Sequence, residues 1–173
     1  RERTQRRPQP PQIPIHVLSL TGTLERMTAM TSADTAALAT AVGRYAARFH
    51  AAVGARHHIA SPLGAWLLLA LIGAPAEALG MPAEDAARHA RLLLDDPHPA
   101  VAAATAAWTR DDPPPAAARW LAGLPAAVER GPVPTQDAAD AWARRHTLGM
   151  IDSFPLTLDH TVLCVLVNAL ATR

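Results

Sequence analysis

Residues 161–170 read Thr-Val-Leu-Cys-Val-Leu-Val-Asn-Ala-Leu. β-branched residues and leucines follow one another here without the polar alternation of a half-exposed strand. Such a run is typical of a strand that is buried on both faces. The sequence therefore predicts a central strand over Thr161–Leu170. Cys164, the single cysteine of the chain, is expected to pack inside it as a small hydrophobic side chain and not as a reactive thiolate.

The segments before this strand alternate between helical and extended patterns. Gln136–Leu148 is predicted as a helix with Trp142 on its apolar side, and Val101–Trp108 as a strand between proline breakers. A short helix is expected over Ala116–Leu124 and an extended segment over Ala127–Pro134. The order of elements indicates a mixed, α+β chain.

Helices dominate the first half of the chain. Apolar residues recur every three to four positions between residues 31 and 54, which predicts an amphipathic helix. Ser61-Pro62 offers a cap and a first helical residue for a helix over Leu63–Ile72, which is apolar nearly all round and should be buried. A further helix is predicted over Pro82–Leu94, and the four tryptophans (Trp66, Trp108, Trp120 and Trp142) are expected in the core.

Composition and charge exclude several classes of protein. All 16 basic residues are arginine, a bias typical of GC-rich coding sequence, and we expect a GC-rich bacterial source. The net charge of +1 gives no long-range field toward nucleic acid or an anionic membrane. The longest apolar run, Ala65–Ala76, is too short to span a bilayer. Residues 1–30 are predicted to be a disordered Arg- and Pro-rich arm before a domain over residues 31–173.

Two stretches of the chain resemble the serpin family of protease inhibitors. The first is His57-His-Ile-Ala-Ser-Pro-Leu-Gly-Ala-Trp66, followed by an apolar helix and Gly73-Ala74. It is similar to the family pattern Asn-x-x-x-Ser-Pro-Leu-Ser. The second joins Thr147-x-Gly149-x-Ile151 to Leu166-Val-Asn-Ala-Leu170, as the family joins a helix ending in Thr-x-Gly-x-Ile to a central strand ending in Val-Asn-Ala. The resemblance implies a serpin-like α+β fold, with helices on a large mixed sheet, of which this chain is the N-terminal half.

The resemblance also implies a polar cluster under the sheet, called the shutter, where the strands of a serpin part. Ser61 and Asn168 match the family there, and Thr147 and Gly149 match its helix end. His57 stands where the family has Asn, and Gly64 where it has a second Ser. A histidine nitrogen is able to replace an amide, but Gly64 has no group to donate. We therefore expect the shutter to be only partly preserved.

The function that the resemblance implies is suicide inhibition of a serine or cysteine protease. A reactive loop is cut and then inserts as a strand beside the central strand, trapping the protease as an acyl-enzyme. No catalytic residue, cofactor or metal is needed, so the protein is not expected to be an enzyme. The reactive loop is absent from this chain, which we expect to be a fragment or a truncated gene product. The alternatives are a non-inhibitory serpin-fold or helical interaction domain, and an inactive truncated fragment.

Other functions find little support in the residues. His50, His57 and His58 suggest a metal site, but adjacent side chains of an extended segment point to opposite faces. Ser61 lies at a helix cap and not in the strained turn of a hydrolase nucleophile. No export signal precedes Thr31, so the family's frequent extracellular location and a cytoplasmic one both stay open.

Overall fold

The computed structural model describes residues 30–54, 60–96 and 101–172. These residues form six helices and a sheet of three strands. The helices are α1 (Ser32–Val53), α2 (Pro62–Leu71), α3 (Ala76–Leu79), α4 (Ala83–Asp95), α5 (Pro115–Gly123) and α6 (Gln136–His146). The strands are β1 (Val101–Thr109), β2 (Val128–Pro132) and β3 (Cys164–Thr172). The predicted α+β class is thus confirmed.

The sheet has β1 in its centre and β3 at one edge. β2 runs parallel to β1 from the pair Thr105–Val128 to the pair Thr109–Pro132. β3 runs antiparallel to β1 along the whole of both strands. The strand order β2-β1-β3 leaves the outer edge of β3 without a neighbour among the described residues.

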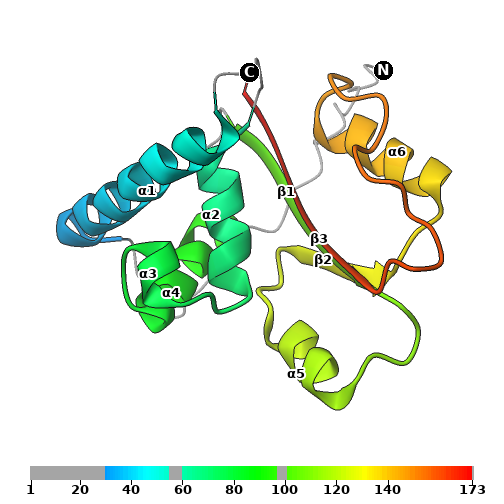
Figure 1. The fold of residues 1–173 in the computed structure, drawn as a ribbon, viewed down its shortest axis with the longest axis horizontal. Helices are drawn as coiled ribbons and strands as arrows, with labels where there is room; N and C mark the ends of the chain where they lie inside the picture. The colour runs from blue at the N-terminus through cyan, green and yellow to red at the C-terminus, as the bar shows by residue number, and fades with distance from the viewer. Residues whose placement is uncertain (1–29, 55–59, 97–100, 173) are drawn as a thin grey trace, which may run out of the picture.

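Helices cover both faces of this sheet. α1 to α4 lie together on one side and α6 lies on the other, with the strands seen nearly edge-on between them (Figure 1). The first core surrounds α2, whose Trp66 is fully buried and donates from its indole nitrogen to the carbonyl oxygen of Leu79 at 2.9 Å. The second core joins the sheet to α6 through Trp108 and Trp142, whose rings meet edge to face with centroids 5.4 Å apart.

Local signals in the sequence account for most helix ends. The hydroxyl of Thr31 accepts from the backbone N–H of Asp34, and the Asp34 carboxylate accepts from the Thr31 N–H, forming a capping box. Ser61 caps α2 in the predicted way, with Pro62 at its first position. α3 was not predicted, because it is a single turn between Pro75 and the left-handed Gly80.

Two predictions about the central strand are wrong. β3 begins at Cys164 and not at Thr161, since the N–H and hydroxyl of Thr161 both bond to the Asp159 carboxylate and hold the chain in a turn. The strand is also not buried on both faces: Leu163 just before it is 71% exposed and Cys164 is exposed. Among the described side chains of β3, only Val165, Ala169 and Ala171 are buried, and all three belong to the same face of the sheet.

Some of the remaining sequence-based predictions are confirmed and others are not. Trp66, Trp108 and Trp142 are buried as expected, but Trp120 is only half-buried. The helix predicted over Gln136–Leu148 ends two residues early, at His146. His57 and His58 lie outside the described residues, and within those residues no three His, Cys, Asp or Glu side chains gather as a metal site would require. In the same part of the chain, no helix is long and apolar enough to cross a membrane.

Candidate functional site

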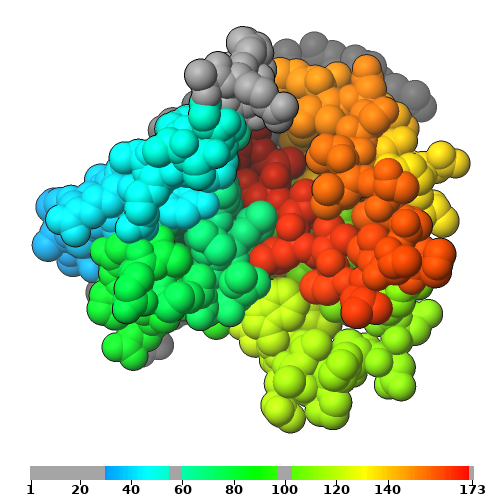
Figure 2. Space-filling model, in the orientation of Figure 1, coloured from blue at the N-terminus to red at the C-terminus, as the bar shows by residue number. Residues whose placement is uncertain are grey.

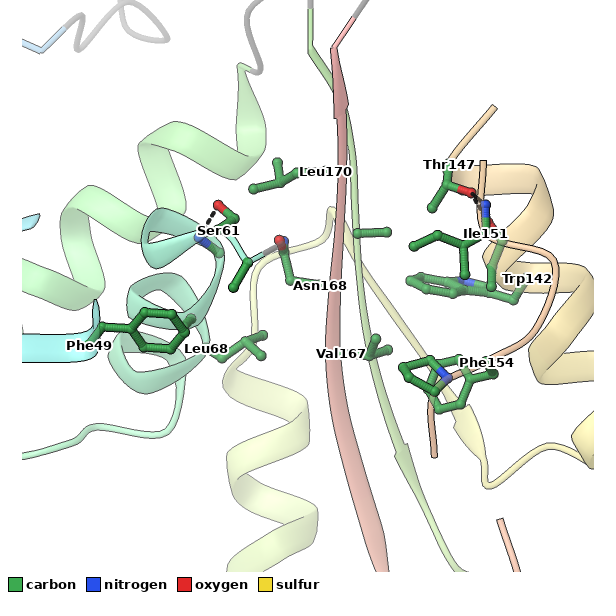
Figure 3. Close-up of a pocket in the computed structure, with 16 residues that line it drawn as sticks. Phe49, Ser61, Leu68, Trp142, Thr147, Ile151, Phe154, Val167, Asn168 and Leu170 are labelled. Carbon is green, nitrogen blue, oxygen red and sulfur yellow. Dashed lines mark hydrogen bonds between the residues drawn. The ribbon is translucent and has the colours of Figure 1, made fainter. Parts of the chain in front are cut away.

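A groove runs along the open edge of β3. It has a volume of about 460 Å³, within the range of protein binding sites. In Figure 2 part of β3 is visible in a hollow between α2 and the loop that follows α6. The groove has one wall on each face of the sheet: α2 lies against one face of β3, and α6 with the loop after it lies against the other (Figure 3).

The wall on the α2 side places small residues against the strand. The Ser61 hydroxyl accepts from the backbone N–H of Gly64 at 3.0 Å, which caps the helix. A Cβ atom on Gly64 would lie 2.7 Å from Oδ1 of Asn168 and 3.3 Å from Cδ1 of Leu170. Gly64 therefore leaves the space that the Asn168 side chain fills.

The polar contact in the middle of the groove joins two strands. Nδ2 of Asn168 donates to Oγ1 of Thr105 at 2.9 Å, and the two residues face each other in the β1–β3 register. Thr105 is 1% exposed, so this hydrogen bond pairs a hydroxyl that water does not reach. The sequence did not single out Thr105. Its only signal is a lone hydroxyl in the otherwise apolar strand Val101–Trp108.

The wall on the α6 side is shaped by the end of that helix. Thr147, 2% exposed, donates to the Ala143 carbonyl at 2.8 Å and accepts from the Ile151 N–H at 3.0 Å. Gly149 has a φ of 77°, and its N–H donates to the Arg144 carbonyl at 2.8 Å. A left-handed glycine after the last turn is a common helix stop. These bonds turn the chain so that Ile151 lines the groove.

The loop after α6 is tied back to the helix by side chains. Asp140 accepts from the Phe154 N–H at 2.7 Å and from the side-chain amide of Gln136 at 3.2 Å. These hydrogen bonds hold the pKa of the Asp140 carboxyl below its usual range. The Gln136 side chain also accepts from the Leu158 N–H at 3.0 Å. The loop therefore has a defined course beside the open edge.

The sequence-derived candidates are partly brought together. The groove is lined by four of them, namely Ser61, Gly64, Thr147 and Asn168, while Gly149 lies in the turn beside it and His57 lies outside the described residues. None of the described lining residues carries an ionisable side chain. For the described residues, a lining without charged side chains along a strand edge suits the pairing of backbone groups.

Comparison with known proteins gives one kind of match. No family model matches the sequence, and no curated protein does. Among solved structures, thyroxine-binding globulin complexed with thyroxine-fluorescein aligns with a TM-score of 0.56 at 15% identity, over 78% of this chain and 48% of that one. Cleaved kallistatin complexed with heparin aligns at 0.54 and 17% identity, over 80% and 48%. A serpin from the trematode Schistosoma haematobium aligns at 0.53 and 14% identity, over 79% and 45%.

The chain has a serpin-like fold. Further solved structures that align with the chain include tengpin in its native and latent states and a loop C-sheet serpin polymer. The chain spans between 35% and 48% of the length of these serpins. Identities of 14% to 21% establish the serpin-like fold and leave activity, partners and the expected bacterial source as predictions.

Proposed function

We propose that this chain is the N-terminal part of a serpin-type protease inhibitor, in which the outer edge of β3 receives an inserted strand. The observation that supports the proposal is the groove along that edge, which has walls on both faces of the sheet and no charged side chain among its described lining residues. An added strand would pair with the outer backbone groups of β3, which face no other strand among the described residues, and its alternate side chains would contact the two walls. Residues 31–173 then form the N-terminal part of the inhibitor domain, and residues 1–30 an arm before it.

The shutter is part of this proposal. Asn168 and Thr105 hold β3 to β1 in the middle of the groove, while Ser61 and Gly64 fix the start of α2 directly beneath. Gly64 has no side chain that could bond to Asn168, and the Thr105 hydroxyl accepts a hydrogen bond from Asn168 instead. We propose that these residues set how readily β3 and the sheet adjust to a new strand, with Thr147 and Gly149 fixing the opposite wall.

Inhibition would require a target protease and a reactive loop outside this chain. A serine or cysteine protease would attack a loop carbonyl, release the new amino terminus and remain as an ester or thioester on the loop. Insertion of the loop beside β3 would then leave the acyl-enzyme unhydrolysed. The protein itself contributes strand pairing and no catalytic group.

The test is a stable complex with a protease. The full-length protein is incubated with a panel of serine and cysteine proteases and run on denaturing gels. Inhibition predicts a band at the summed mass that resists SDS, and the same protease with its nucleophile replaced by alanine should give none. Cleavage by every protease without such a band would contradict inhibition.

The alternative is a serpin fold kept for binding. It is favoured by one comparison, since thyroxine-binding globulin is in complex with thyroxine-fluorescein. Inhibition needs small residues in the hinge that leads into the reactive loop, because those residues must enter the sheet. A proline or a charged residue in that hinge of the full-length protein would favour the binding function.

A further inference from the structure

A second cavity shares no lining residue with the β3 groove, although α2 contributes to both. It has a volume of about 220 Å³ between the end of α2, the middle of α4 and the end of α5. Its floor is apolar and buried, from Ala70, Leu71 and Leu124. Two exposed arginines, Arg91 and Arg119, and the half-buried Trp120 also line it. No acidic residue is among the described residues that line it.

Two of the side chains that shape this cavity are held in place by hydrogen bonds. The indole nitrogen of Trp120 donates to the Leu71 carbonyl at 2.8 Å, which fixes the ring between α5 and the end of α2. Nη2 of Arg91 donates to the Gly123 carbonyl at 2.9 Å, which fixes the guanidinium between α4 and α5. A guanidinium has five N–H donors, so Arg91 keeps others for a ligand.

Arg119 supplies a second positive charge to the lining of the cavity. In the described part of the chain, no ion pair or hydrogen bond engages its guanidinium. Two exposed arginines in one lining, with no acidic residue among the described lining residues, favour an anion. The ring of Trp120 and the apolar floor favour a flat apolar body attached to that anion.

We propose that this cavity binds a small aromatic carboxylate. The carboxylate would bond to Arg119 and Arg91, and the ring would lie on the apolar floor beside Trp120. The volume is below the range of about 300–1,000 Å³ for drug-sized ligands, which selects a compound with one ring. This site goes beyond the proposed inhibitor function, because it uses α2, α4 and α5 and no residue of the β3 groove.

Benzoate is the probe, with the full-length protein at low ionic strength so that the exposed charges are little screened. Saturation-transfer NMR and tryptophan fluorescence measure binding. A ligand of this size in a shallow cavity is expected to bind with a Kd on the order of 1 mM. Benzamide, which has the ring without the charge, and acetate, which has the charge without the ring, should each bind at least about tenfold more weakly.

Variants assign the site. Arg119→Gln is expected to weaken benzoate binding about tenfold, because it removes one charge from the lining of the cavity. Arg44→Gln is the matched control, since Arg44 is an exposed arginine of α1 outside the cavity. Arg91→Lys keeps the charge and loses the planar fork, and should weaken binding less than Arg119→Gln.

Three results would overturn the proposal. One is the absence of saturable benzoate binding up to about tenfold above the expected Kd. Another is equal binding of benzoate and benzamide, a comparison made on the wild-type protein that does not depend on the folding of a variant. The third is an equal effect of Arg119→Gln and Arg44→Gln, which would indicate a general effect of net charge. None of these results bears on the protease assay, so the two proposals fail separately.

Discussion

Asn168 and Thr105 are 63 residues apart in the chain and are joined by a side-chain hydrogen bond of 2.9 Å across neighbouring strands. The bond lies at the level of Gly64, whose missing side chain leaves room for Oδ1 of Asn168. The side-chain amide of Asn168 thus donates from its nitrogen to the neighbouring strand β1, while its oxygen lies against the start of α2. The contact between α2 and β3 therefore depends on an exact match of a small residue and a polar one.

Replacing Thr105 by Val should destabilise the protein. The change keeps the shape and the β-branched side chain but removes the hydroxyl, so Nδ2 of Asn168 loses its partner in a half-buried site. We expect the free energy of unfolding to fall by about 1 kcal/mol in urea titrations. Thr109→Val, at another buried position of β1, is the control. An unchanged stability in Thr105→Val would show that Asn168 finds an equally good partner elsewhere.

A double-mutant cycle on Gly64 and Asn168 tests the steric part of the same contact. Gly64→Ala places a Cβ 2.7 Å from Oδ1 of Asn168, so one of the two must shift. The substitution should cost about 1 kcal/mol more in the wild-type background than in Asn168→Ala, where the oxygen is gone. Gly43→Ala is the control, because its Cβ would meet nothing within 4 Å and Ala is the better helix former.

A different result of that cycle would contradict the steric clash between Gly64→Ala and Asn168. If Gly64→Ala stabilises both backgrounds equally, as Gly43→Ala should, then the side chain of Asn168 rotates away at no cost. The groove would then tolerate the second Ser of the family pattern, and Gly64 would not explain the departure from it.

The sequence predicts local features of this fold well and long-range ones poorly. Thr31 and Ser61 act within four residues of themselves, so their caps are visible in the sequence. Trp66 and Trp142 lie on apolar helix faces and are buried accordingly. The hydrogen-bond partner of Asn168 depends on the register of two strands, which no local sequence pattern gives. The family pattern indicates the position of Gly64 as the neighbour of Asn168, and it does not indicate Thr105.

The prediction that β3 is buried on both faces is wrong for a related reason. An apolar run indicates that a strand belongs in a core, but its exposure depends on which strands lie beside it. In the part of the chain that the structure describes, β1 pairs with one edge of β3 and no strand pairs with the other, and β3 begins after a turn that the Asp159 carboxylate holds. Leu163 and Cys164 are exposed as a consequence.

Acid should loosen the loop that forms one wall of the groove. Hydrogen bonds from the Phe154 N–H and the Gln136 side chain lower the pKa of Asp140 from its ordinary 3.8. A lowered folded-state pKa stabilises the folded protein above the unfolded pKa, and the stabilisation is lost as the pH falls through the folded value. We therefore expect the Phe154 amide to lose protection from hydrogen exchange below about pH 4, after correction for the intrinsic rate.

Variants separate the charge of Asp140 from its shape. Asp140→Asn keeps an oxygen for the Phe154 N–H, so protection should become lower at neutral pH and nearly independent of pH in the acid range. Asp140→Ala should remove protection at every pH. Asp137→Asn, an exposed position on the same helix, serves as the control. If the wild-type amide and that of Asp140→Asn respond to acid alike, the carboxylate does not hold the loop.

Cys164 should react with a thiol reagent in the native protein. It is the first residue of β3 and is exposed, which corrects the buried thiol that the sequence predicted. Partial burial raises the pKa of the thiol, so the thiolate fraction at neutral pH is smaller than in a free cysteine. We expect one equivalent of an aromatic disulfide reagent to react without denaturant, more slowly than with a cysteine peptide at pH 7.5. The difference in rate should narrow as the pH rises, and Cys164→Ser should take up no reagent because the chain has one cysteine. A thiol that reacts only after unfolding would mean that the edge of β3 at Cys164 is covered in solution.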